Sequence, residues 1–221
     1  YLVVHYDRPA GDYAGWGLHA WGDIDQTVEW TDPIPFTGED SFGRFAWVKL
    51  TPGGSNVGFI IHNGDDKDTD GDRFVNPQVT PEIWINSGDA AVHESLAAAR
   101  GFARIHYHRD DGDYGDATSP DFNDFWGLHL WGEAIAAGEG TEWAAPKPPT
   151  GSDDFGVYWD VALKDPQAAV NFIIHRGDTK DPGPDESFVP AEVPTVWKQS
   201  LDEAIYPSRG AAQGYATIHY H

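Results

Sequence analysis

The chain repeats itself, and this repeat limits its fold more than any other feature of the sequence. VGFIIHNGDDKD at Val57–Asp68 returns as VNFIIHRGDTKD at Val170–Asp181. From this part of each copy onward the two copies stay 113 residues apart, so that Trp84 corresponds to Trp197. A register held over so long a stretch predicts two modules that share one topology and one pattern of core residues.

The repeat also predicts where the modules begin and end. VVHYDR at Val3–Arg8 corresponds to RIHYHR at Arg104–Arg109, only 101 residues later, so the second copy carries extra residues in its early loops. YATIHYH at Tyr215–His221 repeats the opening of the second copy. We expect a first module over 1–101, a second over 102–214, and the opening strand of a further repeat over 215–221.

Composition indicates strands and turns. Aromatic residues make up 14% of the chain, with 10 Trp, beside 25 Gly and 16 Pro. Seven short segments of the first copy have the composition of strands, at 2–6, 17–22, 43–50, 56–63, 73–76, 81–86 and 90–95. The expected fold is all-β, with two immunoglobulin-like antiparallel β-sandwich modules in tandem. The Ala-rich segment Glu94–Gly101 is expected to be the linker, or at most a helical turn.

The charge of the chain excludes several classes of partner. With 36 acidic and 14 basic residues the net charge is −22, and the few Lys and Arg form no cluster. Nucleic acid and anionic membrane surfaces would be repelled, so neither is an expected partner. The longest apolar runs fall far short of the ~20 residues that span a bilayer, and the first residues do not form a signal-peptide pattern. The chain has no Cys, so it has no disulfide or thiolate metal site.

The segment WGLHAW is the first candidate for a binding surface. In a strand, side chains alternate between faces, so His19 and Trp21 would point outward while Leu18 faces the core. His129 and Trp131 repeat the pair in the second copy. An exposed aromatic pair suits the apolar C–H face of a pyranose ring. The alternative is a core Trp beside a strand His, and alternation alone leaves both open.

A turn-rich acidic loop supplies the second candidate. Lys67 and Asp72 recur as Lys180 and Asp185 at the same spacing. Sugar hydroxyls both donate and accept hydrogen bonds, so an ammonium and a carboxylate can together recognise one ring. The alternative is a solvated acidic loop, the commoner role of such charge runs.

Two patterns could indicate a metal. Asp66–Gly71 matches the start of a calcium loop, but its twelfth position is Pro77 and the second copy lacks the alternating Asp residues. His106 and His108 would share a strand face, yet the first copy has Asp7 in place of the second His. We therefore expect no metal and no cofactor.

Catalytic motifs are missing from the sequence. A glycoside hydrolase needs two carboxylates about 5 or 6.5–9.5 Å apart, one of them in an apolar setting, whereas the acidic residues here lie in polar turns. No GxSxG, HExxH, P-loop or GxGxxG pattern occurs. We expect no catalytic residues and no enzyme activity in this chain.

Taken together, the motifs resemble carbohydrate-binding module family 41, the pullulanase-associated α-glucan-binding modules. The motifs that carry the resemblance are IHYHR, GWGLHxWG, the DDFG turn, VxFIIHxGDxKD and the final PxxW strand, and they cover both copies with small differences between the copies. The resemblance implies an immunoglobulin-like sandwich of secreted, extracellular or cell-surface pullulanases and amylopullulanases. Such modules bind maltooligosaccharides, starch, amylose, amylopectin, glycogen and pullulan without a cofactor, and they are covalently joined to the catalytic domain.

The resemblance also implies which residues bind sugar. The family's site is a WxW pair with a Lys and an Asp. Carried over, the site residues are His19, Trp21, Lys67 and Asp72 in the first copy and His129, Trp131, Lys180 and Asp185 in the second. Both copies depart from the family in having His at the first aromatic position, where the stacking surface is smaller. One extra residue follows Lys180, so Glu186 competes with Asp185 for the acidic role.

Overall fold

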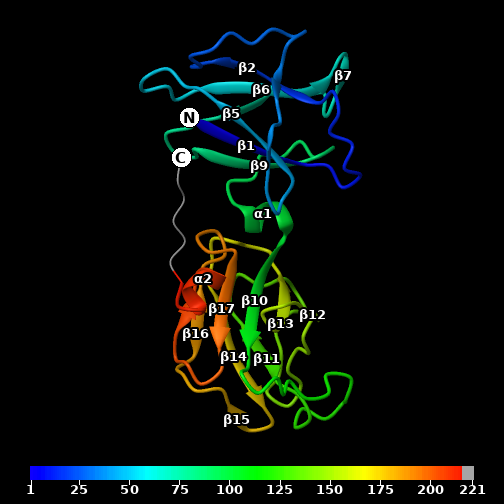
Figure 1. Ribbon diagram of the computed structural model, residues 1–221, viewed down its shortest axis with the longest axis vertical. Helices are drawn as coiled ribbons and strands as arrows, with labels where there is room; N and C mark the ends of the chain where they lie inside the picture. Colours follow the sequence, from blue (N-terminus) through cyan, green and yellow to red (C-terminus); the bar gives the residue numbers. More distant parts are fainter. Residues whose placement is uncertain (216–221) are drawn as a thin grey trace. The chain divides into compact units, whose positions relative to one another are not determined.

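The computed structural model describes residues 1–215 and divides into two compact units, Tyr1–Ala99 and a second that begins at Arg100. We call them the first and second module. Each is a sandwich of two sheets, as predicted (Figure 1). The predicted opening strand of a further repeat lies, except for Tyr215, outside the described residues.

The first module packs two sheets against each other. One sheet has the order β4 (Gly38–Glu39), β5 (Arg44–Val48), β1 (Leu2–Asp7) and β9 (Glu82–Asn86). The other has the order β3 (Ile34–Pro35), β2 (Gly17–Gly22), β6 (Val57–Asn63) and β7 (Asp66–Lys67), and β8 (Arg73–Val75) also pairs with β6. The pairs are antiparallel except for β1 with β9, which is parallel.

The second module repeats this arrangement. One sheet has the order β12 (Gly151–Ser152), β13 (Val157–Ala162), β10 (Phe102–His108), β17 (Thr195–Gln199) and β18 (Ile205–Tyr206). The other has the order β11 (Gly127–Trp131), β14 (Val170–Arg176) and β15 (Thr179–Lys180), and β16 (Glu186–Phe188) pairs with β14. Again one pair is parallel, β10 with β17.

The predicted alternation of the WGLHAW strand is confirmed. Leu18 and Ala20 on β2 are buried, as are Leu128 and Leu130 on β11. Trp16 packs partly buried against the first core, and its counterpart Trp126 is a member of the second core. These residues form the inner face of the sheet, so the residues between them point outward.

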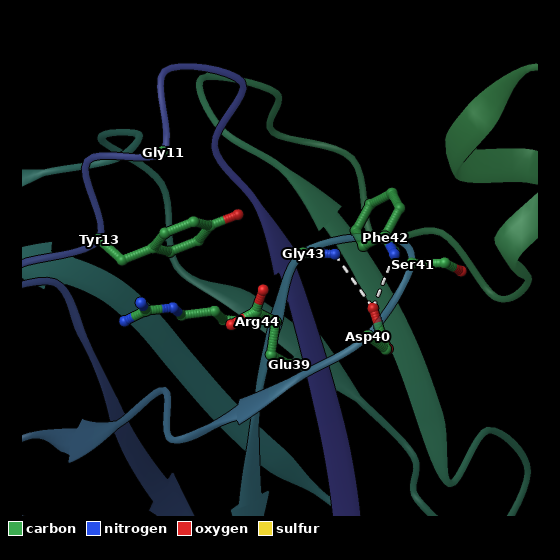
Figure 2. A pocket seen from close by; sticks show the side chains of 8 residues that line it. All are labelled: Gly11, Tyr13, Glu39, Asp40, Ser41, Phe42, Gly43 and Arg44. Atoms are coloured by element: carbon green, nitrogen blue, oxygen red, sulfur yellow. Dashed lines mark hydrogen bonds between the residues drawn. The ribbon is translucent and has the colours of Figure 1, made fainter.

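The DDFG turn at 153–156 has the sequence DSFG at 40–43, and in both copies its glycine is packed tightly against backbone. Asp40 Oδ1 accepts hydrogen bonds from the backbone N–H groups of Phe42 at 2.7 Å and Gly43 at 3.0 Å (Figure 2). A Cβ at Gly43 would lie 2.5 Å from the carbonyl oxygen of Tyr6. Only glycine fits there.

Asp68 of the calcium-like loop belongs to a buried cluster of polar side chains. Asp68 accepts hydrogen bonds from the hydroxyls of Tyr6 at 2.7 Å and Ser87 at 3.0 Å, and from Arg73 Nη2 at 3.1 Å. Asp181 takes the same place in the second module, where it accepts from Tyr107 and Ser200. These Asp residues thus stabilise the sandwich, since buried carboxylates need such partners.

One predicted strand was wrong. Residues 90–95 form only an isolated bridge, Trp84 with His93, because the side chain of Asp89 holds the start of this segment in a turn through the N–H of Ala91. The linker is a helical turn, α1 (Leu96–Arg100), and α2 (Arg209–Ala212) repeats it. In residues 1–215 no helix is long and apolar enough to cross a membrane.

Candidate functional site

The predicted aromatic pair lies on the outer face of the sheet in each module. His19 and Trp21 on β2 are half-buried, with ring centroids 5.8 Å apart and planes inclined by 38°. His129 and Trp131 on β11 repeat this at 5.2 Å and 36°. The structure therefore brings each predicted pair together on a surface that faces away from the core.

A second tryptophan joins this surface in the first module. Trp30, from the loop between β2 and β3, stacks on His62 of β6 with centroids 3.9 Å apart and planes inclined by 5°. Its ring also meets the ring of His19 edge-on at 5.4 Å. His62 is 1% exposed, and the carbonyl oxygen of Gly64 accepts a 2.8 Å hydrogen bond from its Nδ1. The buried imidazole thus packs against the inner face of the indole and holds it in place.

The second module builds the same surface from equivalent residues. Trp143 stacks on His175 at 3.9 Å and 9°, and meets His129 edge-on at 5.5 Å. The indole N–H of Trp143 donates to Asp178 Oδ1 at 3.1 Å, which fixes the ring further. We name Trp21, His19, Trp30 and His62, with their four counterparts, the aromatic groups of the two modules.

Each predicted lysine reaches the aromatic group of its module. Lys67 on β7 has its Nζ 5.8 Å from the ring centroid of Trp30, and Lys180 on β15 lies 5.6 Å from that of Trp143. Both lysines are exposed. Distances near 6 Å permit a cation–π attraction and leave the ammonium free to donate to a ligand.

The structure distinguishes the two acidic candidates of the second module. Asp185 is exposed, with Oδ1 3.8 Å from Lys180 Nζ. Glu186 is buried in β16 and pairs with Lys198 of β17, and burial raises the pKa of Glu186 to about 7. Asp185 is therefore the acid beside the lysine. Asp72 is exposed in the matching turn of the first module.

Burial sets the charge of the second aromatic group. It lowers the pKa of His129 and of His175, because a charged imidazole would lose its water. Both rings are consequently neutral near pH 7. An uncharged aromatic surface with one cation at its edge can stack on a sugar ring and donate to a hydroxyl.

Two of the hollows on the surface of the first module lie in different settings. One adjoins the Trp30–His62 stack and is also lined by Gly15, Pro33 and Asp65. The other, drawn in Figure 2, is lined by Tyr13 and by residues 39–44 of the opposite sheet. The first hollow belongs to the candidate site, because Trp30 and His62 of the aromatic group line it. No member of the aromatic group lines the second.

Sequence reasoning missed Trp30, His62 and their counterparts as members of the site. A signal existed, because Trp30 and Trp143 stand 113 residues apart, which is the spacing of the repeat. The two tryptophans take equivalent places, since each stacks on a histidine of the neighbouring strand. Their contact with the strand residues depends on how the loop folds back, which alternation does not reveal.

Comparisons with known proteins agree with the repeat. A model of the family described as bacterial pullanase-associated domain matches residues 1–94 and 101–207. An α-amylase of Streptomyces lividans is 36% identical over 149 residues, which are 65% of this chain and 15% of that protein. Pullulanase A of Streptococcus pneumoniae serotype 2 is 25% identical over 182 residues, which are 79% of this chain and 14% of that protein. This chain thus spans a small part of both relatives.

Solved structures resemble the chain as well. A protein described as a streptococcal virulence factor that binds α-glucan is 23% identical, with a TM-score of 0.44 over 93% of this chain and 95% of that chain. The family match covers both repeats, as the resemblance of the motifs predicted. The chain therefore belongs to the bacterial pullanase-associated domain family.

Proposed function

We propose that this protein chain binds α-glucans, with one stretch of glucan at each aromatic group. It thereby holds an attached glycoside hydrolase on its substrate. Its own role is binding, and catalysis belongs to a covalently joined domain. Starch, glycogen, pullulan and maltooligosaccharides are the proposed partners. The observation that carries the proposal is that both modules place two indoles, two imidazoles and a lysine on one sheet face.

Such a surface has the chemistry that a glucan needs. The C–H faces of glucose rings are apolar and stack on indole, while the hydroxyls at the ring edges take hydrogen bonds from charged groups. Lys67 and Lys180 would donate, and Asp72 and Asp185 would accept. Each hydroxyl bond replaces one with water and gains only about 0.5–1.5 kcal/mol, so stacking is the main source of affinity.

The relatives support this choice of ligand and of attached enzyme. Those named above are an α-amylase and a pullulanase, enzymes of α-glucan chemistry, and this chain matches a small part of each. Starch and pullulan are polymers too large to enter a bacterial cell, so we propose that the whole protein is secreted or displayed on the cell surface.

Sedimentation with insoluble starch tests the proposal. The 221-residue chain should move to the pellet, equally with and without a chelator, and should release no reducing sugar. A chain that carries both Trp21→Ala and Trp131→Ala should remain in solution. Binding that a chelator abolishes would favour a calcium-dependent adhesion module, and release of reducing sugar would favour a glycosidase.

A further inference from the structure

The first module carries a row of three residues that extends its aromatic group. Trp21 on β2 is the pairing partner of Gly58 on β6, and Gly58 is in turn the partner of Phe74 on β8. Residues paired in this way point to one face of the sheet. Trp21, Gly58 and Phe74 therefore lie side by side on the face that holds the aromatic group.

Glycine in the middle of the row lets the two rings meet. A Cβ at Gly58 would collide with the Cε2 and Nε1 atoms of Trp21, so the indole lies over the bare backbone of β6. The ring of Phe74 stands at 89° to it, with centroids 6.0 Å apart. Phe74 is 57% exposed, so its ring remains available to a ligand.

The second module has the same row with different chemistry. Trp131 pairs with Asn171, and Asn171 pairs with Ser187. A polar amide and a hydroxyl thus replace the glycine and the phenylalanine of the first module. The apolar surface beside Trp131 therefore lacks the ring that Phe74 adds beside Trp21.

The orientation of Phe74 follows from how β8 is anchored. Its neighbours Arg73 and Val75 are both buried, and Arg73 Nη2 donates to Asp68 Oδ2 at 3.1 Å and to the carbonyl of Asp89 at 2.7 Å. In β16 the neighbours of Ser187, Glu186 and Phe188, are buried in the same way. The two buried neighbours therefore hold the strand against the core in each module. The outward residue, Phe74 or Ser187, is not needed for this and can differ between the modules.

We propose that Phe74, which lies beside Trp21 across Gly58, forms an additional glucose subsite and makes the site of the first module longer than that of the second. This inference rests on the proposed function. Consecutive glucose units of an α-1,4-glucan turn relative to one another, so two rings at a large angle can each cover the face of one unit. The second module would bind a shorter stretch and use Asn171 and Ser187 for hydroxyl contacts.

Titration with maltooligosaccharides of increasing length tests the inference. The chain is used at full length with Trp131→Ala, which leaves the first module as the binding site, and is compared with the same chain carrying Phe74→Ser. Loss of one aromatic contact should weaken binding of maltohexaose and maltoheptaose about 3- to 10-fold. Maltotriose affinity should stay within about twofold. Phe74→Tyr should restore the affinity for the long ligands.

The reciprocal change provides the matched control. In a full-length chain with Trp21→Ala, which leaves the second module, Asn171→Gly together with Ser187→Phe should strengthen binding of the long ligands and not of maltotriose. Thermal unfolding of every variant checks that its fold is kept.

Two negative results have different meanings. If the Trp131→Ala chain binds no maltooligosaccharide of any length, the proposed function fails. If it binds and Phe74→Ser changes all lengths equally or none, the subsite is overturned while the function stands.

Discussion

The indole of Trp143 stacks on the imidazole of His175, with ring centroids 3.9 Å apart and planes inclined by 9°. The imidazole cannot turn freely, because it is fully buried and its Nδ1 donates to the carbonyl oxygen of Gly177 at 2.7 Å. Trp30 and His62 repeat the arrangement. Each loop tryptophan is thus held in place before a ligand arrives, which lowers the entropic cost of binding.

We expect Trp143→Ala to remove most of the affinity of the second module for maltoheptaose, at a cost of about 2 kcal/mol or more. The measurement is calorimetric titration of a full-length chain in which Trp21→Ala silences the first module. Trp197→Ala is the matched control, since Trp197 also stacks on a histidine, His106, but on the opposite sheet. Equal losses in both variants would show that Trp143 acts through the fold rather than through contact with sugar.

His175 should make the second module less stable as the pH falls below neutral. Burial depresses the pKa of His175 in the folded state, so its contribution is complete above the ordinary histidine pKa of about 6.5 and is lost as the pH falls through the lower folded value. Glu186 titrates in the same range with the opposite sign, since its folded pKa is raised. The informative quantity is therefore the difference in unfolding temperature between the parent and His175→Gln from pH 7 to pH 5. The parent should lose more over this range, and parallel curves would contradict the assignment.

The repeat and the alternation of the WGLHAW strands predicted the architecture and the faces of the sheets well. They could not predict the parallel pairing of β1 with β9, because alternation says which face a residue joins and not which strand lies beside it. The strand predicted over 90–95 was wrong for a different reason, since local turn contacts of Asp89 prevailed over strand composition.

The candidate site was predicted in part. The outward pair and the lysine follow from alternation and from the repeat, and the structure brings them to one surface. Trp30 and Trp143 come from irregular loops, whose course depends on tertiary packing. The choice of Asp185 over Glu186 likewise depended on which carboxylate finds a buried partner, Lys198, across the sandwich.

The buried pair of Glu186 and Lys198 leads to a prediction about stability. Lys198→Met leaves Glu186 unpaired, and at pH 8 this should lower the free energy of unfolding by about 3 kcal/mol, because an unpaired buried charge is costly. At pH 5 the loss should be smaller, since Glu186 then takes a proton. Adding Glu186→Gln should remove the pH dependence. Denaturant unfolding at the two pH values measures this, and the same loss at both would contradict it.

Two sites on one chain should favour polymers over short ligands. Once one module has bound, the other meets the next stretch of glucan at a high effective concentration, which can strengthen attachment by about 10²-fold. The parent chain should hold glycogen far more tightly than chains with only Trp21→Ala or only Trp131→Ala, while all three have similar affinity per intact site for maltotetraose. Equal affinity for glycogen would mean that the sites act independently.

The most direct test of the account is a calorimetric titration of the 221-residue chain with maltotetraose. We predict saturable binding at two sites per chain, reduced to one by Trp21→Ala or by Trp131→Ala alone and abolished by both together. Absence of binding, or binding that persists in the double variant, would contradict the claim that the two aromatic groups are α-glucan sites.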